Sequence, residues 1–309
     1  METIAITGGK GGVGKSTVSV LLANKFRREG KKVMLVDLDV ECPNDHLLLG
    51  RELASVGEKV YAKFPKLNKE KCTKCLHRGS GATLRGGLCV EKCPNNAIFQ
   101  PPGEYPLFMH DLCSGCGLCW NLCPFGAIEI EEKITGEIFV NQLGTPAAGK
   151  TSPDESGEVG ECGEDFPSAW LVSGRSVGVV EETGPVVAEV KKFAYQLAEE
   201  KGVDVILLDT APGLHCAVIR ALWEVDKAYA VTEPTPLGAH DLRLILKLLK
   251  KLRIPAKIIL NQADLGDRDS VDNIAHNLNT EIAYEIPYSK EIVNAYSKGR
   301  LYDFSLQHF

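Results

Sequence analysis

A glycine-rich loop near the start of the chain, Gly9-Lys10-Gly11-Gly12-Val13-Gly14-Lys15-Ser16, limits what this sequence can fold into. The short β-run Thr3–Ile6 precedes the loop, and apolar residues at helical spacing follow it from Val18 to Phe26. In a strand, loop and helix of this kind, glycines let backbone N–H groups close around phosphate oxygens, and the helix N-terminus favours negative charge. The sequence therefore predicts a phosphate-binding loop in which Lys15 reaches the β- and γ-phosphates and Ser16 holds Mg²⁺.

Further β-runs have the near-continuous apolar character of strands buried in a parallel sheet. They are Val33–Val36, Val205–Leu208, Ala228–Val231 and Lys257–Leu260. Apolar residues at i, i+3 and i+4 predict amphipathic helices at Val187–Leu197 and Leu242–Leu252. This alternation predicts a doubly wound, mainly parallel α/β sheet with helices on both faces, and the polar residues that follow the strands mark its ligand edge.

Eight of the eleven cysteines form two copies of an iron–sulfur motif. Residues 113–124 carry the compact form, Cys-x-x-Cys-x-x-Cys-x-x-x-Cys-Pro, and residues 72–94 repeat it with thirteen residues between the second and third cysteines. In such a run the fourth cysteine ligates the other cluster. The sequence therefore predicts two 4Fe–4S clusters: cluster I on Cys72, Cys75, Cys89 and Cys123, and cluster II on Cys93, Cys113, Cys116 and Cys119.

Structural zinc is the alternative for these cysteines, because zinc also binds paired Cys-x-x-Cys knuckles. Two Cys-Pro dipeptides, and an Ala-Ile pair three residues after each of those prolines, favour clusters over zinc. The long gap at 76–88 leaves open a labile, three-iron or remodelled cluster I, although a surface-loop insertion also explains it. Cys42, Cys162 and Cys216 fall outside the motifs and are interpreted as ordinary thiols.

Composition limits the partners and the location of the chain. It has 309 residues, of which 44% are hydrophobic and 25% charged, and its net charge of −6 argues against broad nucleic-acid binding. The N-terminus does not have the pattern of a signal peptide, and no apolar run approaches the roughly 20 residues that span a bilayer. We therefore expect a cytoplasmic protein without a membrane anchor, whose cysteines are ligands rather than disulfides.

The loop at residues 10–16 resembles the deviant Walker A loop of the MinD/ParA/Mrp (SIMIBI) P-loop ATPases, and residues 209–213, Asp-Thr-Ala-Pro-Gly, are similar to their switch II. The resemblance covers residues 1 to about 55 and about 168 to 290. It implies ATP and ADP as ligands, Mg²⁺-dependent hydrolysis that is slow and stimulated by a partner, and a homodimer or a heterodimer with a paralogous ATPase. It implies nucleotide contacts for Gly9, Gly11, Gly12, Val13, Gly14, Lys15, Ser16, Thr17, Asp209, Gly213 and Asn261.

The same resemblance implies the catalytic roles. Lys10 is the signature lysine, which reaches the partner's phosphates across an ATP-sandwiched dimer, and it acts together with Lys15. Asp39 in switch I orients the attacking water, with Asp37 and Asp45 as rival candidates for that role. Phosphoryl transfer needs positioning and charge neutralisation more than a strong base, so these residues are chemically sufficient.

The binding roles follow from the resemblance as well. Asp209 is expected to act through water on the Mg²⁺ held by Ser16. Thr17 is expected to touch the α-phosphate, and Asn261 to read the edge of the adenine base.

Residues 66–132 resemble a bacterial two-cluster ferredoxin, so the whole chain resembles a MinD-superfamily ATPase with an inserted ferredoxin domain. The expected organisation is a first part of the P-loop ATPase domain at 1–62, an inserted α+β ferredoxin-like domain at 63–133, a connector at 134–167 and the second part of the ATPase domain at 168–309.

The leading functional hypothesis is ATP-gated electron transfer to a redox or iron–sulfur protein, because eight ligands inside one domain suit retained clusters. An iron–sulfur carrier of the Mrp type is the first alternative, but that group uses a C-terminal Cys-x-x-Cys, and no cysteine follows Cys216. The second alternative is a MinD/ParA-like positioning ATPase with a sensory ferredoxin domain. The tail at 298–309 is not strongly basic, which weakens that alternative.

Overall fold

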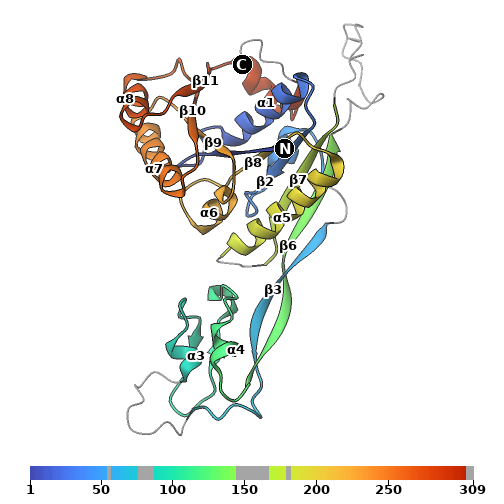
Figure 1. Cartoon of the computed structure of the whole chain (residues 1–309), viewed down its shortest axis with the longest axis vertical. Coiled ribbons are helices and arrows are strands. Elements are labelled where there is room, and N and C mark those ends of the chain that lie inside the picture. The colour runs from blue at the N-terminus through green and yellow to red at the C-terminus, as the bar shows by residue number, and fades with distance from the viewer. Residues whose placement is uncertain (54–56, 76–86, 144–166, 179–181, 304–309) are drawn as a thin grey trace. The chain divides into compact units, whose positions relative to one another are not determined.

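The computed structural model describes residues 1–53, 57–75, 87–143, 167–178 and 182–303. The chain divides into two units, which are treated separately below (Figure 1). The first unit comprises Met1–Gly57, Ile138–Arg175 and Val187–Phe309, and the second comprises Glu58–Glu137 and Ser176–Val186.

The first unit is built on a parallel sheet with the strand order β11-β10-β9-β1-β8-β2-β7. All pairs among these seven strands are parallel, and most of their residues are buried. The sheet confirms the predicted α/β class and the predicted apolar strands. The strands are β1 (Glu2–Thr7), β2 (Val33–Asp37), β7 (Ala169–Ser176), β8 (Val205–Asp209), β9 (Lys227–Thr232), β10 (Ala256–Asn261) and β11 (Ile282–Ile286).

Helices of the first unit pack on this sheet. Val18, Leu22 and Phe26 of α1 are buried in one cluster with Ile4 and Leu35 of the strands, as the apolar spacing predicts. The helices are α1 (Lys15–Arg28), α2 (Asp45–Leu48), α5 (Gly184–Lys201), α6 (Cys216–Leu222), α7 (Pro236–Leu252), α8 (Asp269–Leu278), α9 (Lys290–Ser297) and the 3₁₀ turn η2 (Leu301–Asp303).

The second unit carries the eight motif cysteines on short elements. Its core is small, with Ile98, Cys119 and Ile128 buried together and several other cysteines packed against them. The elements are β3 (Glu58–Leu67), α3 (Leu88–Glu91), β4 (Ile98–Phe99), β5 (Leu107–Phe108), the 3₁₀ turn η1 (His110–Leu112), α4 (Leu118–Leu122) and the first part of β6 (Ile128–Leu143).

Strand β6 runs where the sequence suggests a connector. Residues 134–143 of the expected connector belong to this strand, whereas 144–166, with Cys162, lie outside the described residues. So do residues 76–86 of the cysteine gap and the end of the tail, 304–309. Apolar residues do alternate along β6, but Glu132 and Gly136 interrupt the pattern that marks a strand.

Within the described ranges, no helix combines the length and the apolar character that crossing a membrane requires.

Candidate nucleotide site and cysteine sites

The glycine loop is shaped by two left-handed residues and by an amide from β10. Gly12 and Gly14 have φ values of 84° and 89°, which side chains rarely adopt. A Cβ on Gly14 would also collide with the side-chain nitrogen of Asn261. That nitrogen donates a hydrogen bond to the Val13 carbonyl oxygen, at 3.0 Å. Asn261 therefore fastens the end of β10 to the phosphate-binding loop.

A cavity of about 520 Å³ opens over this loop. At one end it is lined by eight of the residues predicted from sequence, namely Gly11, Gly12, Gly14, Lys15, Ser16, Thr17, Asp39 and Asn261. Gly9, Lys10, Val13, Asp209 and Gly213 do not line it. The sequence did not point to the other end, which is made by Gln262, Pro287, Tyr288, Ser289, Ile292, Val293 and Tyr296.

The missed end of the cavity is formed by the segment between β11 and α9. Ser289 caps α9, since its side-chain oxygen accepts hydrogen bonds from the backbone N–H groups of Glu291 and Ile292. The backbone N–H of Tyr288 donates to Asp264 at 2.6 Å. A proline followed by a serine N-cap was the available sequence signal, but it predicts a helix start and no ligand.

Lys15, Ser16 and Asp209 meet beneath the loop. The Ser16 hydroxyl donates to one carboxylate oxygen of Asp209 at 2.6 Å, and the Ser19 hydroxyl donates to the other at 3.0 Å. Lys15 is 8% exposed. Burial lowers the pKa of Lys15, while the nearby carboxylates of Asp209 and Asp39 oppose that shift. Ser16, predicted to hold Mg²⁺, and Asp209, predicted to act on that ion through water, are thus already in contact.

Lys10 points elsewhere. Its ammonium lies 2.6 Å from a carboxylate oxygen of Glu233, which follows β9. The same oxygen accepts a hydrogen bond from the Thr235 hydroxyl at 3.1 Å, and Thr235 caps α7 through the Gly238 N–H. Lys10 is therefore held by its own chain.

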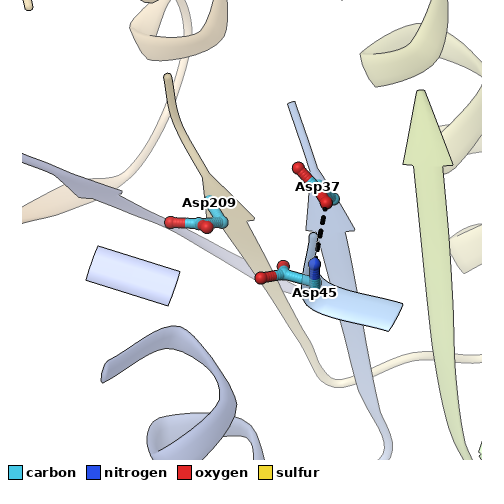
Figure 2. Close-up of side chains that lie close together, drawn as sticks. All are labelled: Asp37, Asp45 and Asp209. Carbon is cyan, nitrogen blue, oxygen red and sulfur yellow. Dashed lines mark hydrogen bonds between the residues drawn. The ribbon is translucent and has the colours of Figure 1, made fainter. Parts of the chain in front are cut away.

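Three buried aspartates lie together where β2 and β8 end and α2 begins (Figure 2). One carboxylate oxygen from each of Asp37, Asp45 and Asp209 lies within 4.8 Å of the others. Asp37 accepts hydrogen bonds from the backbone N–H groups of Asp39, Asn44 and Asp45, at 3.1, 2.8 and 3.1 Å. In the described part of the chain, the polar neighbours of the Asp45 carboxylate are other carboxylates.

Burial and mutual repulsion favour the protonated forms of these aspartates. Burial is the larger cause and raises the pKa of Asp37 to about 8, with the charge of Asp209 adding to it. Burial also raises the pKa of Asp209 to about 6 and that of Asp45 well above its ordinary value. A hard divalent cation prefers carboxylate oxygens, so the chemistry of this cluster fits Mg²⁺ beside Ser16.

The eight motif cysteines fall into two groups of four. Burial raises the pKa of the Cys89 thiol to about 11, and Cys75, Cys123 and Cys72 add to the effect. Burial also raises the pKa of Cys113, whose neighbours are Cys116 and Cys93, and the pKa of Cys119 beside Cys113 and Cys116. All eight thiols are free of disulfides. The structure therefore groups the cysteines as the crossed ligand sets require.

Each cysteine group lines a cavity of its own. Cys75, Cys89 and Cys123 line a cavity of about 310 Å³ together with Leu88 and Phe125. The other group lines a smaller apolar cavity, with Cys93, Cys113, Cys116 and Cys119 beside Pro65, Ile98 and Trp120. Backbone N–H groups of Ala97 and Gly115 donate to the sulfurs of Cys93 and Cys113 at 3.3 and 3.4 Å. Such bonds are typical of the surroundings of iron–sulfur ligands.

The chain belongs to the CobQ/CobB/MinD/ParA nucleotide-binding domain family, whose model matches residues 4–302. An uncharacterized protein of Methanocaldococcus jannaschii is 33% identical over 299 residues, which cover 97% of this chain and 90% of that protein. MinD of Pyrococcus horikoshii, solved with Mg-ADP, shares the fold with a TM-score of 0.51 at 18% identity, over 96% of this chain and 86% of that one.

A shorter similarity concerns a ferredoxin. An uncharacterized ferredoxin of Methanocaldococcus jannaschii is 51% identical over 53 residues, which cover 17% of this chain and 31% of the ferredoxin. The comparisons thus show a member of the MinD/ParA family, in which a short segment is similar to a ferredoxin.

Proposed function

We propose that this chain is an ATP-hydrolysing dimeric switch whose nucleotide state is coupled to two 4Fe–4S clusters, and that it passes electrons to a partner protein. The observation that carries the proposal is the grouping of eight free cysteines into two sets of four in a chain that also has a P-loop cavity. Family membership and the Mg²⁺-compatible carboxylates support the nucleotide part, and the similarity to a ferredoxin supports the cluster part.

In this proposal the cavity of about 520 Å³ binds ATP and ADP. The loop N–H groups and Lys15 bind the phosphates, and Thr17 contacts the α-phosphate. Ser16 would hold Mg²⁺ and Asp209 would act on it through water; the ion neutralises phosphate charge when bound. The amide nitrogen of Asn261 is already used by Val13, so its carbonyl oxygen remains to accept a hydrogen bond from the adenine amine.

For hydrolysis we assign Asp39 to orient the attacking water. Asp39 lines the cavity, whereas Asp37 is occupied by three backbone N–H groups and Asp45 is fully buried, which favours Asp39 over its rivals. Lys10 would leave Glu233 and contact the phosphates bound by the other subunit, either a second copy or a paralogous ATPase. This requirement for a second subunit explains a slow basal rate that a partner stimulates.

The clusters supply one-electron redox chemistry when bound. The chain's own contribution is to hold them, with cluster I on Cys72, Cys75, Cys89 and Cys123 and cluster II on Cys93, Cys113, Cys116 and Cys119. These thiols are mostly half-buried and lie inside one unit, which suits clusters that are kept rather than passed on.

A redox titration of anaerobically purified protein with and without MgATP tests the coupling. We expect MgATP to shift at least one cluster potential, and cluster reduction to change the hydrolysis rate. The coupling would be refuted if MgATP left both cluster potentials unchanged and cluster reduction left the hydrolysis rate unchanged. Rapid cluster transfer to an apo-acceptor would instead indicate a carrier, and intact cellular function after Cys113→Ser and Cys116→Ser would indicate a positioning switch. The variant Lys15→Ala, which cannot use MgATP, is the control.

A further inference from the structure

One lysine of the first cysteine motif has a left-handed backbone where the second motif has a glycine. In the second motif, Gly115 stands between Cys113 and Cys116 with a left-handed φ of 67°. Lys74 occupies the same position between Cys72 and Cys75, with a φ of 55°, and the following Cys75 is left-handed as well, with a φ of 52°. A left-handed backbone is unfavourable for a residue with a side chain, and a glycine would adopt it freely. Strain of this kind points to a use for the lysine side chain.

The charge of the two motifs differs in the same direction. The segment 69–75 carries Lys69, Lys71 and Lys74 against the single acid Glu70. The matching segment 110–116 has His110, Leu112 and Gly115 at the positions of the three lysines, and it keeps the acid as Asp111. Positive charge has therefore been placed beside the cluster I ligands and not beside the first cysteines of cluster II.

Two of these lysines make no ion pair with a carboxylate of the described residues. Lys74 donates to the Gly103 carbonyl at 3.0 Å, and its ammonium lies 4.4 Å from the centre of the Tyr105 ring. The Lys69 ammonium lies 5.6 Å from the same ring. Lys71, by contrast, pairs with Glu129 at 3.3 Å. The ammonium groups of Lys69 and Lys74 thus both lie near the Tyr105 ring, and no carboxylate of the described residues neutralises their charge.

This cationic group adjoins the cluster I cavity through Lys74, whose two chain neighbours line it. Thr73 and Cys75, on either side of Lys74, line that cavity together with Phe125, which is 50% exposed. The backbone N–H of Asn68 donates to the Ala127 carbonyl at 2.8 Å and so fastens the lysine loop to the segment that carries Phe125. An apolar surface with a rim of positive charge is complementary to an acidic partner.

We propose that Lys69, Lys74, Tyr105 and Phe125 form the docking surface for an acidic one-electron carrier protein, which exchanges electrons with cluster I. This proposal rests on the proposed function in one respect, because cluster I must be present. In the exchange, the carrier loses one electron and cluster I is reduced by one electron. No bond forms or breaks, and no proton moves.

The experiment uses the full chain with its clusters, and a reduced acidic two-cluster bacterial ferredoxin as the probe. Stopped-flow absorbance gives the second-order rate of electron transfer as ionic strength is raised. We expect Lys69→Gln with Lys74→Gly to lower this rate about tenfold at low salt and to flatten its salt dependence, because steering by charge is lost. Lys74→Gly also relieves the left-handed strain, so the variant is expected to fold and keep its clusters.

The controls separate the two proposals. Lys59→Gln with Lys63→Gln removes the same charge from exposed positions of β3 and should leave the rate within about twofold of the unchanged protein. Reduced methyl viologen, a small cation, should reduce the clusters of every variant at least as fast as those of the unchanged protein. An unchanged rate and salt slope in the Lys69/Lys74 variant would overturn the docking surface. Iron content and visible absorbance report separately whether the clusters of the proposed function exist.

Discussion

Lys10 shows how a single side chain can restrain a nucleotide switch. Its pair with Glu233 spans 2.6 Å, and the two side chains are 24% and 17% exposed. Exposed ion pairs contribute only about 0–1 kcal/mol, so this partly buried pair can be broken when a better anion is offered. In the proposed dimer, Glu233 and the phosphates of the other subunit would therefore compete for one ammonium group.

Replacing Glu233 with Gln is expected to strengthen ATP-dependent dimerisation. The neutral amide keeps an oxygen that accepts from Thr235 but no longer holds Lys10 by charge. If each of the two pairs that a homodimer must break contributes about 1 kcal/mol, the dimer dissociation constant should fall about thirtyfold. Sedimentation with a non-hydrolysable ATP analogue measures it. Glu2→Gln removes a comparable pair with Lys227 and should have no effect. A Glu233→Gln dimer no tighter than the unchanged one would contradict the competition.

Asn261→Ala separates two roles of one side chain. Loss of its hydrogen bond to Val13 should weaken the binding of every nucleotide, because the phosphate-binding loop is no longer fastened to β10. Loss of the free carbonyl oxygen should weaken ADP binding further, because the adenine amine donates a hydrogen bond to this oxygen. Guanine has an acceptor at that position and cannot make this bond. Calorimetry is expected to show about tenfold weaker ADP binding and a smaller loss for GDP. Equal losses would leave Asn261 with the loop role alone.

At the scale of elements, strand register explains the buried acidic cluster. Strands β2 and β8 are parallel neighbours, and their last residues, Asp37 and Asp209, are paired in the register. Helix α2 begins at Asp45, whose N–H donates to Asp37, and this brings the third carboxylate into the cluster (Figure 2). The segments that follow β2 and β8 thus bring together carboxylates that repel one another. A bound cation would remove this repulsion.

Asp45→Asn is expected to stabilise the metal-free protein, and more so at pH 8 than at pH 5. The raised pKa values mean that the folded state binds more protons than the unfolded state between about pH 4 and pH 8, so stability falls as pH rises through this window. An amide removes one buried charge and donates to its neighbours. Each kcal/mol regained raises the unfolding temperature by roughly 2–4 °C.

Thermal unfolding in EDTA at the two pH values provides the measurement. Glu200→Gln, an exposed acid-to-amide change on α5, is the control and should not alter the pH dependence. Equal shifts at pH 5 and pH 8 would show that Asp45 is not charged in the metal-free fold.

What the sequence could and could not predict follows from the range of the interactions involved. Strands such as β1 and β8 have an apolar centre and are flanked by helical patterns, so local composition predicts them. Strand β6 was missed because Glu132 and Gly136 interrupt its apolar alternation. The far end of the nucleotide cavity, with Tyr288 and Tyr296, carries no motif and forms only when β11 and α9 are placed beside the loop.

At the scale of the whole molecule, the cysteine pairing crosses the two motifs. Cys123 comes from the second motif but lies with the cysteines of the first, and Cys93 does the reverse. Spacing alone predicted this exchange, because the fourth cysteine of such a run ligates the other cluster. The two motifs therefore depend on each other to form complete sites.

Two matched variants test the crossed pairing. Cys123→Ser is expected to impair cluster I and Cys93→Ser to impair cluster II, each lowering the iron content from about eight atoms per chain towards about four. Electron paramagnetic resonance of the reduced proteins should then show which signal is lost. Cys42→Ser, at an exposed cysteine outside the motifs, should change neither iron content nor spectrum. Loss of the cluster II signal in Cys123→Ser would contradict the assignment.

Strand β6 has a consequence for how such a chain can change during evolution or engineering. Its residues 128–137 belong to one unit and 138–143 to the other, so the boundary falls inside a strand. Loops tolerate insertions of any length, but one added residue in a strand turns every following side chain to the opposite face. At this boundary, we therefore expect the insertion of one residue to be less well tolerated than the insertion of two.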